Sequence, residues 1–211
     1  MATNKDFVVK NGLQVGANTS IEGRITTVDA VQFDANAAVS VGIGELAWNA
    51  DAGTLDLGVT SDVTLQVGQE THVHVKAAEA INNGAVVYAS GAVGNSGQIE
   101  VSNYIANGSI EERRVVGIAT ESASSGDFFY VTTFGTVGSL STDGSTLTTP
   151  ETWNDGDILY ASPNVAGAPT NQLPVSPNQA IAIAFVTNAH ASNGSLMVRA
   201  YDLGYHLEEL H

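Results

Sequence analysis

The sequence predicts an all-β protein, with an extended or intertwined N-terminal β arm followed by a β-sandwich or barrel domain. Short apolar groups recur along the chain, separated by Gly, Asn, Asp and Ser, and almost nowhere do they repeat at the helical interval. Several connectors are Asn-Gly or Asp-Gly pairs, which tolerate the positive φ of tight turns. All 5 prolines lie in the last third of the chain, where they mark connections rather than central strands.

Residues 1–62 form the predicted arm. Single apolar residues are spread there among small polar ones, so the segment has too little apolar side chain to bury a core of its own. Its β-branched content is high and its charge density is low, which is unlike a typical disordered arm. We therefore expect this segment to trimerise, intertwining with the same segment of other copies, and to dock on a larger particle.

Residues 63–204 form the predicted sandwich or barrel, and residues 205–211 form a C-terminal tail. Alternating or continuous apolar groups predict strands here. These groups lie at 63–67, 71–75, 86–88, 115–119, 128–131, 158–160, 181–186 and 196–200. Turn pairs lie at Asn83-Gly84, Asp143-Gly144, Asp155-Gly156 and Asn193-Gly194. Residues 162–178 predict a long surface connection between two strands.

Charge and composition exclude several functional classes. The chain has 7 basic and 22 acidic residues, a formal net charge of -15, which repels the phosphates of nucleic acid and of anionic lipid. It has no cysteine, and therefore no disulfide, thiol nucleophile or thiolate metal site. We expect no signal peptide, because Lys5, Asp6 and Lys10 interrupt the early apolar group, and no apolar run of about 18 residues is visible. We expect no nucleic acid or membrane as a partner, and synthesis in the cytoplasm.

The order of short motifs along the chain resembles structural and fibre proteins of marine cyanobacterial phages. The matching segments are residues 5–13, 44–49, 53–58, 65–70, 83–88, 116–121, 131–135, 156–160 and 204–211. Residues 44–58 resemble a hairpin, containing Trp48, that is common in phage fibre and adaptor proteins. The resemblance implies a virion protein, assembled in the host cytoplasm, usually trimeric and anchored through its N-terminal region. Its partners would be the major capsid protein or tail components.

Fibres of this group commonly continue into a receptor-binding tip, whereas this sequence ends at His211. A capsid decoration protein, cement protein or head fibre is therefore slightly favoured. The alternative is a tail fibre or tail-fibre adaptor. A competing class is a module that binds host-surface glycans through residues 162–178 or near Trp153.

His72 and His74 are the candidate metal ligands. Two residues apart on a strand, they share one face, and a threefold axis would bring six imidazoles together, enough for one octahedral transition-metal ion. Similar phage proteins carry aromatic residues at these two places, which favours packing or solvent exposure. The favoured expectation is therefore no metal and no cofactor.

Other polar groups also have simple structural explanations. Asn49, Asp51 and Asp56 surround Gly53 but lack the later acid of a calcium loop at its required offset, so a hairpin turn is expected. Asp155 and Asp157 are expected to be ordinary turn acids. The chain has no Gly-x-Ser-x-Gly elbow and no phosphate-binding loop. We expect no catalytic residues and no enzymatic activity.

Overall fold

The computed structural model describes residues 16, 19–22, 24–26, 28–36 and 40–199. The chain divides into two units, residues 1–33 and residues 34–211. The described residues of the first unit contain no regular strand. All twelve strands and the single turn of 3-10 helix that the model describes belong to the second unit.

A three-stranded antiparallel sheet begins the second unit. Its strands are β1 (Leu46–Asn49), β2 (Thr54–Gly58) and β3 (Thr64–Val67), with β2 in the centre. Trp48 of β1 lies opposite Leu55 of β2. Because β2 pairs with β3, strand pairing continues across position 62/63, the expected boundary between the arm and the domain. The division of roles at that boundary stays a prediction.

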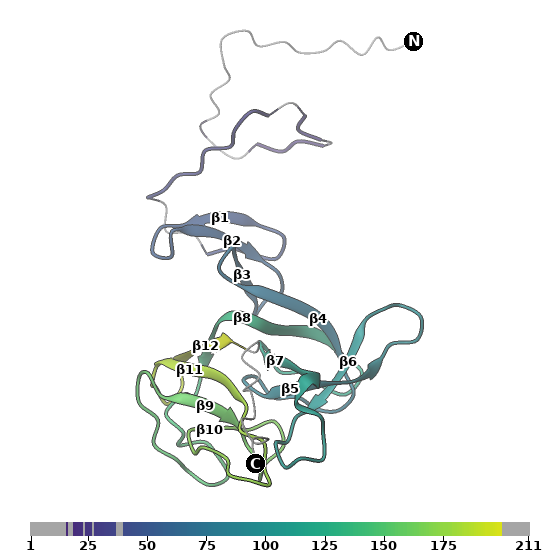
Figure 1. The fold of residues 1–211 in the computed structure, drawn as a ribbon. Helices are drawn as coiled ribbons and strands as arrows, with labels where there is room; N and C mark the ends of the chain where they lie inside the picture. Colours follow the sequence, from purple (N-terminus) through teal and green to yellow (C-terminus); the bar gives the residue numbers. More distant parts are fainter. Residues whose placement is uncertain (1–15, 17–18, 23, 27, 37–39, 200–211) are drawn as a thin grey trace, which may run out of the picture. The chain divides into compact units, whose positions relative to one another are not determined.

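Five strands close into a barrel (Figure 1). Each strand pairs with the next around the ring in the order β4-β6-β5-β7-β8, and β8 pairs again with β4. The strands are β4 (Thr71–Ala77), β5 (Val86–Ala92), β6 (Ile99–Asn103), β7 (Val115–Ala119) and β8 (Phe128–Leu140). The 3-10 turn η1 (Glu112–Arg114) leads into β7. Within the barrel, β4 and β6 pair in parallel, and the other pairs are antiparallel.

A second sheet continues from the far half of β8. It adds β12 (Gly194–Arg199), β11 (Ala182–Asn188), β9 (Ile158–Ala161) and β10 (Pro169–Thr170), in that order. The partner of β8 changes from β4 to β12 at Phe134 and Gly135. Gly135 has φ 115°, and a Cβ there would lie 2.7 Å from the Glu70 side chain. Only glycine therefore fits this junction without strain.

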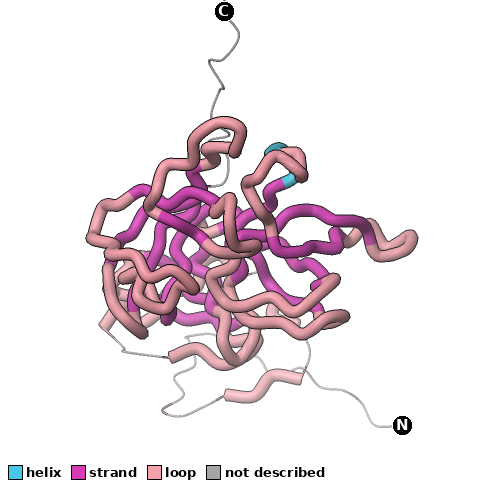
Figure 2. Tube along the Cα trace, turned by 90° about the horizontal axis from the view of Figure 1, so that it is seen from below, coloured by secondary structure: helices cyan, strands magenta, loops and turns pink. Residues whose placement is uncertain are grey.

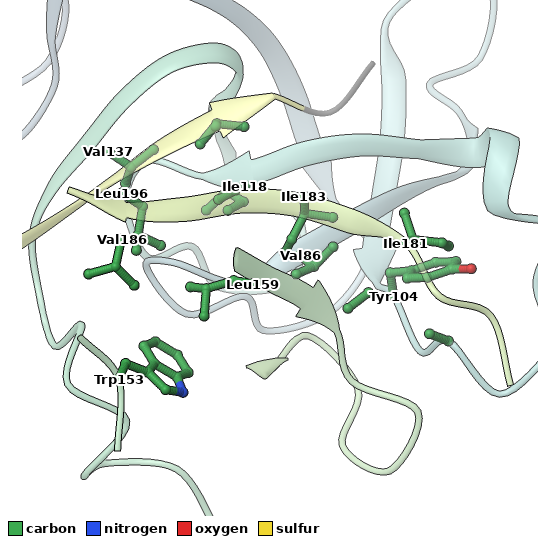
Figure 3. Packing of buried hydrophobic residues seen from close by; sticks show 14 residues of the cluster. Val86, Tyr104, Ile118, Val137, Trp153, Leu159, Ile181, Ile183, Val186 and Leu196 are labelled. Atoms are coloured by element: carbon green, nitrogen blue, oxygen red, sulfur yellow. The ribbon is translucent and has the colours of Figure 1, made fainter. Parts of the chain in front are cut away.

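Alternating side chains on the shared strands build two cores. Val87 of β5 and Ala119 of β7 point into the barrel, whereas the adjacent Val86 and Ile118 point out of it and pack against the second sheet (Figure 3). Tyr104 is fully buried in this outer core, and its hydroxyl donates a hydrogen bond to Gln179 Oε1 at 2.6 Å. Figure 2 shows the strands gathered at the centre with the connecting loops around them.

The all-β prediction, with a barrel as one of its two options, is confirmed. Each of the expected strand segments overlaps a strand of the structure. Two strands were not expected: β6, which completes the barrel, and the short β10 within the connection of residues 162–178. The turn glycines Gly84, Gly144 and Gly156 have positive φ, as expected. Gly194 instead begins β12, where a Cβ would collide with the Thr142 hydroxyl.

Candidate functional site

His74 lies on the outer face of the barrel. Val75, the next residue of β4, packs inside it. The His74 ring stacks on Phe128 with centroids 5.5 Å apart and lies 4.9 Å from Tyr130. Its Nδ1 is 3.0 Å from Gln98 Nε2. The candidate metal ligand His74 therefore packs against two aromatic rings and contacts an amide through its Nδ1.

His72 lies on the same face of β4 but is almost completely covered, with its side chain 4% exposed. Its Nε2 is 3.7 Å from Glu70 Oε2, and neither ring nitrogen has a hydrogen-bond partner among the described residues. Burial lowers the pKa of His72 below its usual value. Within the described chain, no three His, Asp or Glu side chains are grouped as metal ligands. The expectation of no metal, with His72 and His74 as the weak candidates, stays a prediction.

Glu70 is the partner of His72 and is equally covered, with its side chain 6% exposed. Its Oε2 accepts a hydrogen bond from the Gln66 backbone N–H at 2.9 Å, which ties the turn between β3 and β4. Burial raises the pKa of Glu70 and the charge of Asp56 adds to this, whereas hydrogen bonds from the Gln66 and Thr136 backbones oppose it. The pair therefore sits where the three-stranded sheet joins the barrel.

The oxygen-rich turn at Gly53 is closed by its own hydrogen bonds. Asn49 Oδ1 accepts from the backbone N–H groups of Asp51 and Ala52, at 3.1 and 3.0 Å. Asn49 Nδ2 donates to Asp56 Oδ2 at 2.9 Å. Gly53 itself has φ 65°. These contacts match a hairpin turn, the interpretation favoured from the sequence over a calcium loop.

Asp155 and Asp157 likewise bind backbone and amide groups of their surroundings. Asp155 Oδ1 accepts from the Ala189 N–H at 2.6 Å. Asp157 Oδ2 accepts from the Asn154 N–H at 2.9 Å and from Asn171 Nδ2 at 3.3 Å. The two carboxylates therefore link neighbouring loops through hydrogen bonds.

Trp153, near which the competing class placed a glycan site, is a core residue. The residue is 4% exposed and packs with Leu159 and Val186 (Figure 3). Its Nε1 donates to Glu151 Oε2 at 2.7 Å. An indole buried in this way has no face free for a sugar. The burial of Trp153 was not visible in the sequence, because it depends on how the polar segment around it folds over the second sheet.

The connection of residues 162–178 forms a pocket of about 360 Å³ with the segment that precedes Trp153. Leu147, Val165, Leu173 and Val175 give it an apolar lining, and Glu151 is its carboxylate. Leu173 and Val175 are 61% and 71% exposed. The pocket lies in the segment that the sequence singled out for ligand binding, and its lining also includes the amide side chains of Asn164, Gln172 and Asn178.

A larger polar pocket of about 980 Å³ was not anticipated from the sequence. Its lining includes the carboxylates of Asp56, Asp62 and Glu70, which are close in the chain, and of Glu121, which lies much farther along it. Asp56 comes from the three-stranded sheet, and Glu121 follows β7 of the barrel. No sequence motif marks this pocket because folding alone brings these acids together.

The described part of the expected arm exposes its apolar side chains. Ile21, Ile25, Val28 and Val31 are 56%, 67%, 48% and 69% exposed. None of them belongs to a core cluster of the structure. This agrees with a segment that cannot bury its apolar residues within one chain.

Comparison with family models and with curated proteins finds no match. Two solved structures show a distant likeness. The head fiber gp8.5 N base of bacteriophage phi29 is 12% identical, with a TM-score of 0.36, covering 63% of this chain and 96% of that one. A chain from the capsid of Myoviridae phage XM1 is 13% identical, with a TM-score of 0.43, covering 83% and 98%. Likeness at this level carries no inference about function.

Within the described residues, no helix has the length and apolar composition needed to cross a bilayer.

Proposed function

We propose that this protein is a non-enzymatic structural component of a bacteriophage particle, acting as a homotrimer on the particle surface. It serves as a capsid decoration protein, cement protein or head fibre, and the alternative is a tail fibre or tail-fibre adaptor. The ordered series of motifs that resemble cyanophage virion proteins, from residue 5 to residue 211, supports the virion role. The confirmed all-β fold is compatible with it.

The exposed apolar residues of the N-terminal segment carry the proposal that the protein works by association. Ile21, Ile25, Val28 and Val31 would each gain from leaving water, at about 25 cal/mol per Å² of apolar surface buried. Each copy has a net charge of -15, so copies repel one another. Association must therefore depend on apolar burial and backbone pairing, and it should strengthen as salt screens the repulsion.

The mass of the full chain in solution tests association directly. A trimer weighs three times 21.8 kDa, about 65 kDa. A species of that mass at micromolar concentration supports the proposal, and a stable monomer contradicts it.

Imaging the intact particle of the phage that encodes this protein separates the two locations. A site on the capsid lattice supports decoration or a head fibre, whereas a site on the tail supports the alternative. A particle from which the protein is absent would refute the virion role.

Binding of host-surface glycans is the second candidate, favoured by the pocket of residues 162–178. A glycan array with the full chain tests it, with Leu173→Ala as the pocket variant. Ile158→Ala is the matched control, because Ile158 is 51% exposed on β9 and does not line the pocket. Binding that Leu173→Ala weakens and Ile158→Ala retains would support this function, and an array without signal would exclude it.

A further inference from the structure

The three-stranded sheet has one wholly apolar face. Residues directly opposite one another on paired strands point to the same side of a sheet. Leu46, Leu57 and Leu65 form one row across the three strands, and Trp48, Leu55 and Val67 form the next. These two rows make up what we call the apolar face. No charged or hydrogen-bonding side chain lies among them except the indole of Trp48.

The opposite face of the same sheet is polar and looks toward the barrel. Ala47, Asp56 and Gln66 form the row between the two apolar ones. Asp56 and Gln66 line the polar pocket together with Glu121, which follows β7, and Thr136 of β8. Because side chains alternate, the apolar face points away from the barrel.

Within the described residues, no hydrophobic core covers the apolar face, and Trp48, Leu55, Leu57 and Leu65 are half-buried. None of its six residues is fully buried, and Leu46 and Val67 are 46% and 45% exposed. None belongs to either core cluster. A sheet that packs on its own domain normally turns its apolar side inward. Here the apolar side points away from the barrel, which leaves it available for an interaction.

We propose that the apolar face is the contact surface between copies of this chain, and that its occupant is the same face of the other copies in the trimer. This inference rests on the proposed homotrimer and assigns its interface. The distribution of charge supports a second copy as the occupant. The face has no ionisable side chain, and the nearest acid in register, Asp56, points to the opposite side. Copies with a charge of -15 can therefore meet here without bringing their carboxylates together.

The size of the face indicates that it is one part of the interface. Three strands about 4.8 Å apart and two side-chain rows about 7 Å apart give a footprint of about 200 Å². A stable interface buries about 800 Å² on each partner. The remainder must come from other exposed apolar residues, of which Ile43, at 70% exposure, lies just before β1. A charge in the middle of the face should nevertheless disrupt the trimer, since a threefold axis would place three such charges together.

Leu57→Glu tests the assignment, because Leu57 lies in the central strand between Leu46 and Leu65. Thr64→Glu is the matched control: it adds the same charge to the same sheet, at an exposed residue on the opposite face. The mass of each full-length variant is measured by analytical ultracentrifugation, and its fold by circular dichroism and thermal unfolding. We expect Leu57→Glu to weaken association at least 100-fold and Thr64→Glu to leave the trimer intact.

Each outcome has a distinct meaning. A wild-type trimer that Leu57→Glu converts to a folded monomer supports the assignment. A wild-type trimer that survives Leu57→Glu overturns the assignment and leaves the proposed homotrimer standing. A wild-type monomer overturns both. If Leu57→Glu fails to fold, Leu46→Glu on the exposed edge strand decides between the first two outcomes in the same assay.

Discussion

Glu151 fastens the connection of residues 162–178 to the outer core. Its carboxylate accepts hydrogen bonds from Trp153 Nε1 at 2.7 Å, Thr170 Oγ1 at 2.5 Å and the Asn171 N–H at 2.9 Å. Glu151→Ala removes all three. The indole N–H of Trp153 is then buried without an acceptor, at a cost of about 1.5 kcal/mol, and the hydroxyl of the buried Thr170 loses its acceptor at a cost of about 1 kcal/mol. The Asn171 N–H, which water can partly satisfy, adds about 0.5 kcal/mol. We expect a loss of about 3 kcal/mol.

Thermal and urea unfolding of the full chain, followed by tryptophan fluorescence, measures this loss. For a protein of this size, about 3 kcal/mol lowers the Tm by about 9 °C. Glu111→Ala is the matched control, because Glu111 is exposed and its side chain makes no hydrogen bond within the described residues. A Glu151→Ala protein that unfolds within about 0.5 kcal/mol of the control would refute the proposed role of Glu151.

Three further predictions follow from buried groups. Burial, with the charge of Glu112, raises the pKa of Tyr104 to about 12, so stability should fall as the pH rises from 10 toward 12. Tyr104→Phe should reduce that fall and cost about 1 kcal/mol at neutral pH, as measured by urea unfolding; an unchanged alkaline profile contradicts this. Burial lowers the pKa of His72 from its ordinary value of 6.5. Below about pH 6.5 the unfolded chain therefore binds a proton at this imidazole more readily than the folded chain does. Stability should therefore decrease as the pH falls from about 7 to about 5.5, and less so in His72→Leu; parallel pH profiles would count against it. Leu159→Ala, in the fully buried outer core, should cost 2–5 kcal/mol by the same assay, and a cost below about 1 kcal/mol would mean that the site is loosely packed.

The strands of the barrel were predictable where inward-facing apolar residues are closely spaced. Val73 and Val75 of β4 alternate with polar side chains, and both contact the barrel core. The strand β6 was not predicted because it has only two apolar residues, Ile99 and Val101. Its pairing with β4 depends on the fold of the whole barrel. Alternation identifies a strand, but it does not identify its neighbours.

The same limit explains what was missed at the candidate sites. The alternating apolar residues of β1, β2 and β3 were visible in the sequence, and they show which side chains share a face. They do not show that this face points away from the core, because that depends on where Asp56 and Gln66 meet the barrel. The burial of Trp153 was not predictable for the converse reason: the segment around it is polar, and it packs on the core because its polar groups form hydrogen bonds with Glu151 as the acceptor.

Association through apolar surface is the central claim, and the mass of the wild-type chain across a range of concentrations and salt tests it most directly. We expect a species of about 65 kDa, three times 21.8 kDa, that persists to micromolar dilution and is favoured by added salt. A monodisperse monomer of 21.8 kDa under all of these conditions would contradict it.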